Sequence, residues 1–76
     1  MTERQRAVLE FIQTYIRIKG FPPSMQDIAT GLGLRSRSNI HRIVHGLESQ
    51  GLLVTTPYKF RTMKLKERSV EEALAL

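Results

Sequence analysis

Residues 24–51 read SMQDIATGLGLRSRSNIHRIVHGLESQG, and this stretch decides the fold because it contains two short helical patterns separated by a glycine-containing turn. The first pattern begins at Ser24, a residue typical of a helix N-cap, with Asp27 three residues later as its capping partner. It ends in Gly-Leu-Gly at residues 31–33, where Gly33 is the expected turn residue. Two helices joined by such a turn are the helix-turn-helix pattern.

The second pattern begins a few residues later, where Ser36 or Ser38 can cap a third helix. Its apolar residues recur at three- and four-residue steps, which predicts a helix buried on one face. The helix is expected to end near Gln50 and Gly51. Its buried face is expected to hold Ile40, Ile43, Val44 and Leu47.

The residues before this stretch predict a longer helix over about residues 3–19. Thr2 and Gln5 form a capping-box signature, and Gly20 with the prolines at 22 and 23 stops the helix. Its apolar stripe consists of Val8, Phe11, Ile12, Tyr15 and Ile16. The aromatic residues Phe11, Tyr15 and Phe21 are expected in the core.

After residue 51 the pattern changes from helical to extended. A β-branched and apolar run covers residues 52–56, a proline-containing turn covers 57–60, and alternating polar and apolar residues cover 61–65. We expect two short strands that form a hairpin. Ser69, with Glu72 three residues later, is expected to cap a last amphipathic segment over residues 70–76.

The predicted fold class is therefore mainly α with a small β-hairpin, a winged helix-turn-helix of three helices plus a two-stranded wing. We expect this domain over residues 1–66, followed by a short amphipathic C-terminal tail over residues 67–76. A chain of 76 residues is near the lower limit for a fold with one apolar core. No apolar run approaches the roughly 20 residues that a membrane helix needs, so no membrane partner is expected.

The basic residues are concentrated in one part of the chain. The formal net charge is +5, but residues 35–66 alone contain seven lysines and arginines against one carboxylate, Glu48, a net charge of +6. Such a block suits a polyanion, because each neutralised phosphate releases condensed counterions. A solvated basic face is the alternative interpretation of the charge alone.

The exposed side of the third helix carries side chains that can recognise bases. In helix-turn-helix docking, residues near the N-terminus of the second helix of the motif reach base edges in the major groove of duplex DNA. Arg42 can pair with guanine and Asn39 with adenine, whereas serine and histidine can meet more than one kind of edge. The predicted base-reading residues are Ser38, Asn39, His41 and Arg42.

A larger set is predicted to contact the DNA backbone or to act from the wing: Ser24, Arg35, Ser36, Arg37, His45, Tyr58, Lys59, Arg61 and Lys64. Ser36 is explained by capping as well as by a phosphate contact. Arg61 and the turn residues can enter a minor groove or contact phosphates, and the sequence does not choose between these.

No catalytic constellation is recognisable. The Gly-Leu-Gly at 31–33 lacks the rest of a phosphate-binding fingerprint, and the carboxylates are scattered singly. His41 and His45 lie one helical turn apart, but a metal pair would need a third ligand at matching spacing. With no cysteine there is no thiolate site either. We expect no enzyme, no cofactor and no metal.

Several segments match one family in order and spacing. They are Thr2-Glu3-Arg4-Gln5, Gly20-Phe21-Pro22-Pro23-Ser24, Ile28-Ala29, Leu32-Gly33-Leu34-Arg35-Ser36, Ile40-His41-Arg42, Leu47-Glu48-Ser49-Gln50-Gly51-Leu52 and Arg61 to Leu65. Together they resemble the N-terminal DNA-binding domain of the LexA family of SOS repressors. The resemblance implies a winged helix that reads short half-sites, usually as a dimer, to repress transcription. By position, the family's DNA-reading residues correspond to Ser36, Ser38, Asn39, His41 and Arg42.

The resemblance implies a regulator, a repressor above all, that binds double-stranded DNA at SOS-type operators. Residues 37–42 are similar to the branch that binds directly repeated GTTC-type half-sites. A homodimer, formed in solution or only on DNA, and a cytoplasmic location, in a bacterial nucleoid or as a phage-encoded protein, are further expectations.

The family's self-cleaving serine–lysine protease domain has no counterpart here. An excised domain and a standalone regulator both explain this difference, and the apolar ending of residues 70–76 favours the standalone regulator. The alternative function is a protein-interaction winged helix, an anti-activator or a partner of another regulator. Such a module would dock a protein on Leu74 and Leu76 in the tail, residues 67–76.

Overall fold

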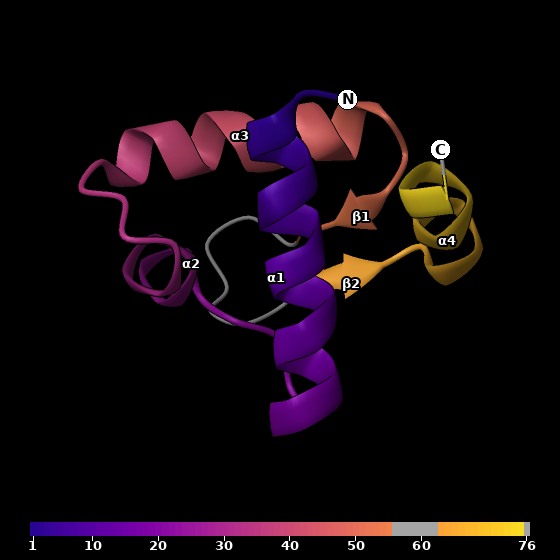
Figure 1. Ribbon diagram of the computed structural model, residues 1–76, viewed down its shortest axis with the longest axis horizontal. Coiled ribbons are helices and arrows are strands. Elements are labelled where there is room, and N and C mark those ends of the chain that lie inside the picture. Colours follow the sequence, from indigo (N-terminus) through magenta and orange to yellow (C-terminus); the bar gives the residue numbers. More distant parts are fainter. Residues whose placement is uncertain (56–62, 76) are drawn as a thin grey trace.

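The computed structural model describes residues 1–55 and 63–75. Its elements are α1 (Glu3–Lys19), α2 (Met25–Gly31), α3 (Arg37–Ser49), β1 (Leu53–Val54), β2 (Lys64–Leu65) and α4 (Glu67–Ala75). Figure 1 shows α3 crossing the N-terminal half of α1, with α2 on one side of α1 and α4 on the other. The predicted fold class, a mainly helical winged helix-turn-helix with a small hairpin, is confirmed. Within the described ranges, no helix is long and apolar enough to cross a membrane.

Helix α1 begins and ends where its local sequence predicts. The Thr2 hydroxyl oxygen accepts a hydrogen bond from the Gln5 backbone N–H at 3.1 Å, and the Gln5 side-chain oxygen accepts one from the Thr2 backbone N–H at 3.1 Å. Gly20 ends the helix with a φ of 83°, in the left-handed region that glycine enters without a Cβ penalty. The local caps therefore determine the length of α1.

The two helices of the predicted motif are also confirmed. Ser24 and Asp27 form a reciprocal capping box at the start of α2, with both hydrogen bonds 3.0 Å long. Gly33 makes the turn with a φ of 67°. Of the two possible caps of α3, the structure selects Ser36, whose hydroxyl accepts from the backbone N–H three residues later at 3.3 Å. Ser38 therefore lies inside the helix, on its first turn.

The core lies where α1, α2 and α3 meet, and two glycines let these helices approach closely. The Phe11 ring packs so tightly on Gly31 that a Cβ at that position would overlap the ring carbons. A Cβ on Gly46 would lie 2.6 Å from the Gln5 side-chain nitrogen, where α3 crosses α1. The buried apolar residues are Val8, Leu9, Ile12, Ile28, Ala29, Ile40, Val44, Leu47, Leu52, Leu53, Met63 and Val70.

One expected core residue lies at the surface. Phe11 packs against the core and Tyr15 is partly buried, but Phe21 is 44 % exposed, so its prediction as a core residue is wrong. Phe21 directly follows the left-handed turn at Gly20. The Phe21 ring instead meets the Tyr15 ring edge-on, with centroids 5.8 Å apart.

The hairpin is short in the described residues. Strands β1 and β2 pair antiparallel, with Leu53 opposite Leu65 and Val54 opposite Lys64. The predicted strands, residues 52–56 and 61–65, are longer than these two-residue strands. The predicted turn, residues 57–60, lies outside the described residues.

The tail forms a fourth helix, and its predicted start is wrong. Helix α4 begins at Glu67, so Ser69 lies within the helix and does not act as its N-cap. The hairpin determines the start instead. The Lys66 N–H donates to the Leu52 carbonyl at 2.9 Å, and the Lys66 carbonyl accepts from the Val70 N–H at 2.9 Å. Val70 is fully buried, so tertiary packing stabilises a helix that is too short to be stable alone.

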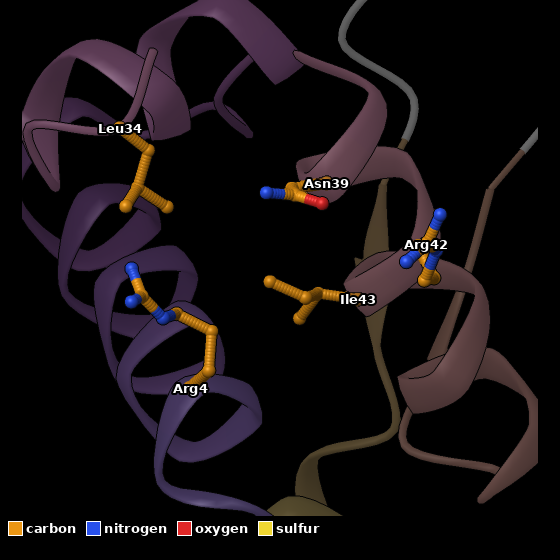
Figure 2. A pocket seen from close by; sticks show the side chains of 5 residues that line it. All are labelled: Arg4, Leu34, Asn39, Arg42 and Ile43. Carbon is orange, nitrogen blue, oxygen red and sulfur yellow. The ribbon is translucent and has the colours of Figure 1, made fainter. Parts of the chain in front are cut away.

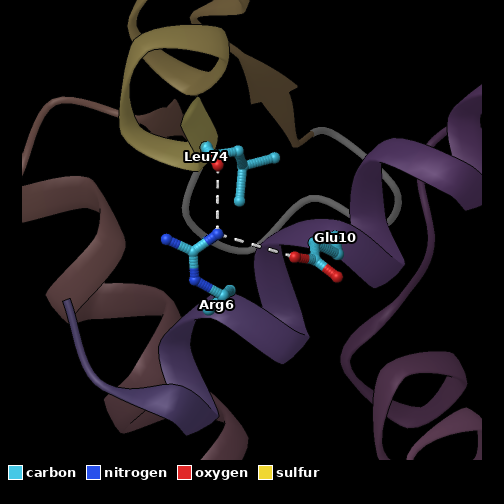
Figure 3. Close-up of polar contacts among 3 residues, drawn as sticks. All are labelled: Arg6, Glu10 and Leu74. Atoms are coloured by element: carbon cyan, nitrogen blue, oxygen red, sulfur yellow. Dashed lines mark hydrogen bonds and ion pairs between the residues drawn. The ribbon is translucent and has the colours of Figure 1, made fainter. Parts of the chain in front are cut away.

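Arg6 connects the C-terminal end of α4 to α1. Its Nη1 donates to the Leu74 carbonyl at 3.2 Å and lies 3.8 Å from Glu10 Oε1 (Figure 3). Leu74 packs against the core, and Leu76 lies outside the described residues. The apolar face of α4 is therefore turned towards the domain.

Candidate nucleic-acid interface

The predicted base-reading residues lie on the first turns of α3, at exposed positions. The buried side of α3 holds Ile40, Val44 and Leu47. Because an α-helix repeats every 3.6 residues, the residues on the opposite side of α3 point away from the core. Ser38, Asn39, His41 and Arg42 are all exposed. The fold thus presents four side chains with hydrogen-bonding groups together on one helical surface.

The N-terminal end of α3 is suited to a phosphate. Arg35, Ser36 and Arg37 are exposed there, and the first turn of the helix contains no acidic residue. A helix N-terminus carries a partial positive charge, which adds to that of the two arginines. Because the Ser36 oxygen already accepts the Asn39 backbone N–H, its hydroxyl proton is the group left to donate to a phosphate oxygen.

The exposed surface of α3 continues to the base of the wing through His45 and Glu48. His45 is exposed, and its Nδ1 lies 3.9 Å from Glu48 Oε1. The same carboxylate oxygen accepts a hydrogen bond from the Thr55 hydroxyl at 3.1 Å. Glu48 therefore holds the chain that leaves β1 against α3. Among residues 1–55 and 63–75, no group of three His, Cys, Asp or Glu residues could hold a metal ion.

A hollow of about 240 Å³ lies between α1 and the flank of α3 (Figure 2). It is lined by Arg4, Leu34, Asn39, Arg42 and Ile43. Arg4 and Asn39 come from different helices and point towards the same space. The sequence prediction did not include Arg4, because it lies far from the basic segment 35–66, and only the crossing of α1 and α3 brings it there.

Ser24 differs from the other predicted backbone contacts because it is only 7 % exposed. Its hydroxyl accepts from the Asp27 backbone N–H, and Asp27 Oδ2 in turn accepts from the Tyr15 hydroxyl at 3.2 Å. In the described residues, Ser24 has the geometry of a helix cap. A phosphate would have to reach it at the first turn of α2.

Only one predicted wing residue is described. Lys64 lies on β2 and is exposed, opposite Val54 on β1. Tyr58, Lys59 and Arg61 lie outside the described residues, so their assignment to the wing contacts remains a sequence prediction.

The chain is similar to one family of known proteins. A family model described as the LexA DNA binding domain matches residues 1–62. The LexA repressor of Clostridioides difficile (strain 630) is 42 % identical over 69 residues, which cover 91 % of this chain and 33 % of that protein. The LexA repressor of Geobacillus thermodenitrificans (strain NG80-2) is 35 % identical over 82 residues, covering 100 % of this chain and 40 % of that protein.

The match is confined to one part of these relatives. The LexA repressor of Brevibacillus brevis (strain 47) is 40 % identical over 65 residues, and the match covers 86 % of this chain and 31 % of that protein. The chain therefore spans well under half the length of the curated relatives that it matches.

Proposed function

The chain belongs to the LexA DNA-binding domain family, and on that premise we propose that it binds duplex DNA sequence-specifically and represses transcription at SOS-type operator half-sites. The observation that carries the proposal is the exposed surface of α3. The second helix of the motif presents Ser38, Asn39, His41 and Arg42 where helix-turn-helix proteins reach the major groove.

Specificity is assigned to two of these side chains above all. Arg42 pairs bidentately with guanine O6 and N7, and Asn39 with adenine N6 and N7, each discriminating by roughly 1–3 kcal/mol. Within the described part of the chain, neither the Arg42 guanidinium nor the Asn39 carboxamide has a hydrogen-bond partner, which supports their availability. Ser38 and His41 contribute further donors or acceptors on the same surface.

Affinity is assigned to the cations around that surface. Arg35, Ser36 and Arg37 bind phosphate at the end of α3, and His45 continues this contact along the helix. Lys64 adds a charge from the wing. Tyr58, Lys59 and Arg61 are proposed as the remaining wing contacts. Ser24, at the start of α2, is retained as a contact through its hydroxyl proton.

The proposed assembly is a homodimer on adjacent half-sites. A domain of 76 residues covers few base pairs, so high specificity calls for two copies. The similarity of residues 37–42 to the GTTC-reading branch suggests directly repeated half-sites of that type. This role requires access to bacterial or phage DNA in the cytoplasm, and it includes no catalytic step.

A protein-interaction function for the tail is less well supported. Val70 is buried and Leu74 packs against the core, so the apolar side of α4 stabilises the domain. A partner that docks on these residues would have to compete with the core for them.

Selection of bound sequences from random duplexes tests the proposal. We expect enrichment of a short motif, repeated at a spacing near one helical turn of DNA or a multiple, about 10 base pairs. Arg42→Ala should reduce the ratio of specific to random binding by roughly 5- to 150-fold, the equivalent of one bidentate pair. Arg17→Ala is the matched control, because it removes the same charge from the far end of α1.

Two outcomes would contradict the proposal. If no motif is enriched, the protein does not recognise sequence. If Arg42→Ala weakens binding to all duplexes by the same factor, Arg42 contacts the backbone and the base-reading assignment is wrong.

A further inference from the structure

We propose that the hollow between α1 and α3 binds a backbone phosphate of the DNA, with Arg4 as its principal cation. This inference rests on the proposed function and adds a contact from a helix outside the recognition motif. It assigns a DNA-binding role to a residue that the linear charge distribution does not single out.

The composition of the hollow favours a small anion. Its volume of about 240 Å³ is below that of pockets for drug-sized ligands. Arg4 and Arg42 supply positive charge, Asn39 supplies an amide donor, and none of the lining residues is acidic. Leu34 and Ile43 complete the lining with apolar surface, which lowers the local dielectric constant and strengthens attraction between a guanidinium and a phosphate.

Comparison of Arg4 with Arg6 shows that, among the described residues, no side chain or backbone group occupies Arg4. The Arg6 guanidinium is engaged, because it donates to the Leu74 carbonyl at 3.2 Å and lies 3.8 Å from Glu10. Arg4 has no hydrogen bond or ion pair within residues 1–55 and 63–75, and its guanidinium points into the hollow (Figure 2). Because the two arginines are two residues apart on a helix, they point about 160° away from each other.

The position of Arg4 on its own helix also favours an external partner. Arg4 lies in the first turn of α1, where the partial positive charge of the helix N-terminus disfavours a cation. Through the helix dipole, Arg4 therefore slightly destabilises α1. An incoming phosphate would stabilise both charges at once.

A phosphate in this hollow would fix the register of base recognition. Asn39 lines the hollow and is also a proposed base-reading residue, so a phosphate held in the hollow would lie next to the recognised base. Phosphate contacts position a protein on the duplex without carrying sequence information. Arg4 would thus hold the DNA backbone against the flank of α3 while its exposed surface reads the bases.

The salt dependence of DNA binding tests the assignment. The observable is the slope of the logarithm of the binding constant against the logarithm of salt concentration, for the wild-type chain, Arg4→Ala, Arg4→Lys and Arg17→Ala. Loss of one phosphate contact should reduce the slope by about 0.9, so the affinity lost between 50 and 200 mM salt becomes about 3.5-fold smaller. Arg4→Lys should keep most of the slope. Arg17→Ala removes the same charge about 20 Å further along α1 and should leave the slope unchanged.

Neutral methylphosphonate linkages, introduced one at a time into the duplex, locate the contact. The neutral linkage at the contacted phosphate should weaken binding by the wild-type chain. The same linkage should leave binding by Arg4→Ala unchanged. Equal weakening of both proteins at every position, with an unchanged slope in Arg4→Ala, would overturn the proposal while sequence preference remained intact. An Arg4-dependent slope without any sequence preference would support this contact and refute the proposed base reading.

Free inorganic phosphate is the other anion that could occupy the hollow. Inorganic phosphate replaces chloride at constant ionic strength, and the amide and side-chain NMR signals of Arg4 and Asn39 are followed. We expect no saturable change in these signals. Saturable, Arg4-dependent changes with an unaltered salt slope in Arg4→Ala would mean that the hollow binds free phosphate, and would overturn the assignment to DNA.

Discussion

Replacing Gly31 with alanine should destabilise the fold by about 1–2 kcal/mol, because the new methyl group would overlap the ring of Phe11. The ring cannot move freely. It packs against the core, and its centroid lies 5.9 Å from that of Tyr15. Overpacking of this kind costs about 1–3 kcal/mol, and the better helix propensity of alanine offsets at most about 1 kcal/mol. In a domain of this size the melting temperature should fall by roughly 4–16 °C.

Gly46→Ala is the matched control for this prediction. It makes the same change on the other close helix approach, but its Cβ meets the end of a flexible side chain, the Gln5 amide nitrogen at 2.6 Å. Gln5 can rotate away at the expense of two exposed 3.1 Å hydrogen bonds, one from Gln50 and one from the Thr2 backbone N–H, and the gain in helix propensity compensates. Its stability should therefore stay within about 0.5 kcal/mol of wild type.

Thermal and urea unfolding, followed by circular dichroism, measure both variants. Adding Phe11→Leu to Gly31→Ala should restore part of the lost stability, because the smaller side chain makes room for the methyl group. The packing argument is refuted if Gly31→Ala is as stable as wild type, or if Gly46→Ala is the more damaging of the two.

Substitutions at three further positions test other parts of the structure. Ser36→Ala removes the cap of α3 and should cost about 1 kcal/mol in unfolding experiments; an unchanged melting temperature would mean that the cap is dispensable. Val70→Ala removes two methyl groups from the core and should cost about 2 kcal/mol; a negligible effect would show that α4 is not anchored there. Glu48→Gln should strengthen binding to all duplexes, because it removes a negative charge from α3. Glu48→Ala should also lower the melting temperature, because the Thr55 hydroxyl loses its acceptor; equal melting temperatures for the two variants would exclude that anchoring role.

The helix boundaries were predictable because their determinants are local. Thr2 with Gln5 and Ser24 with Asp27 satisfy the free N–H groups of the first turn within four residues of sequence. Gly20 and Gly33 have positive φ values where the chain must turn. Such signals do not depend on the rest of the fold, so the sequence alone is sufficient to locate them.

The sequence predictions were wrong where tertiary contacts determine the position of a residue. Ser69 has the local signature of a cap, but α4 begins at Glu67 because the Lys66 backbone is held by Leu52 at the end of the hairpin. Phe21 has the apolar character of a core residue, yet it lies 44 % exposed against the ring of Tyr15 on α1. In both cases the deciding partner is outside the local pattern.

The candidate site could be predicted only in part. The exposure of Ser38, Asn39, His41 and Arg42 follows from helical periodicity, and the structure confirms it. Their contacts with bases remain predictions. Arg4 could not be found in this way, because it meets Asn39 only through the crossing of α1 and α3.

The two arginines at the start of α1 show how a small fold can separate DNA binding from its own stability. Arg6 faces α4, a helix that contains Glu67, Glu71 and Glu72. Arg4 points about 160° away from Arg6 on the same helix, and it lines the hollow beside α3 instead of facing α4. Acidic residues near a DNA phosphate would oppose binding. Because α4 packs against Arg6, the carboxylates of α4 lie away from the proposed contact of Arg4. The placement of one acidic helix thus preserves the basic surface that the charge of segment 35–66 first indicated.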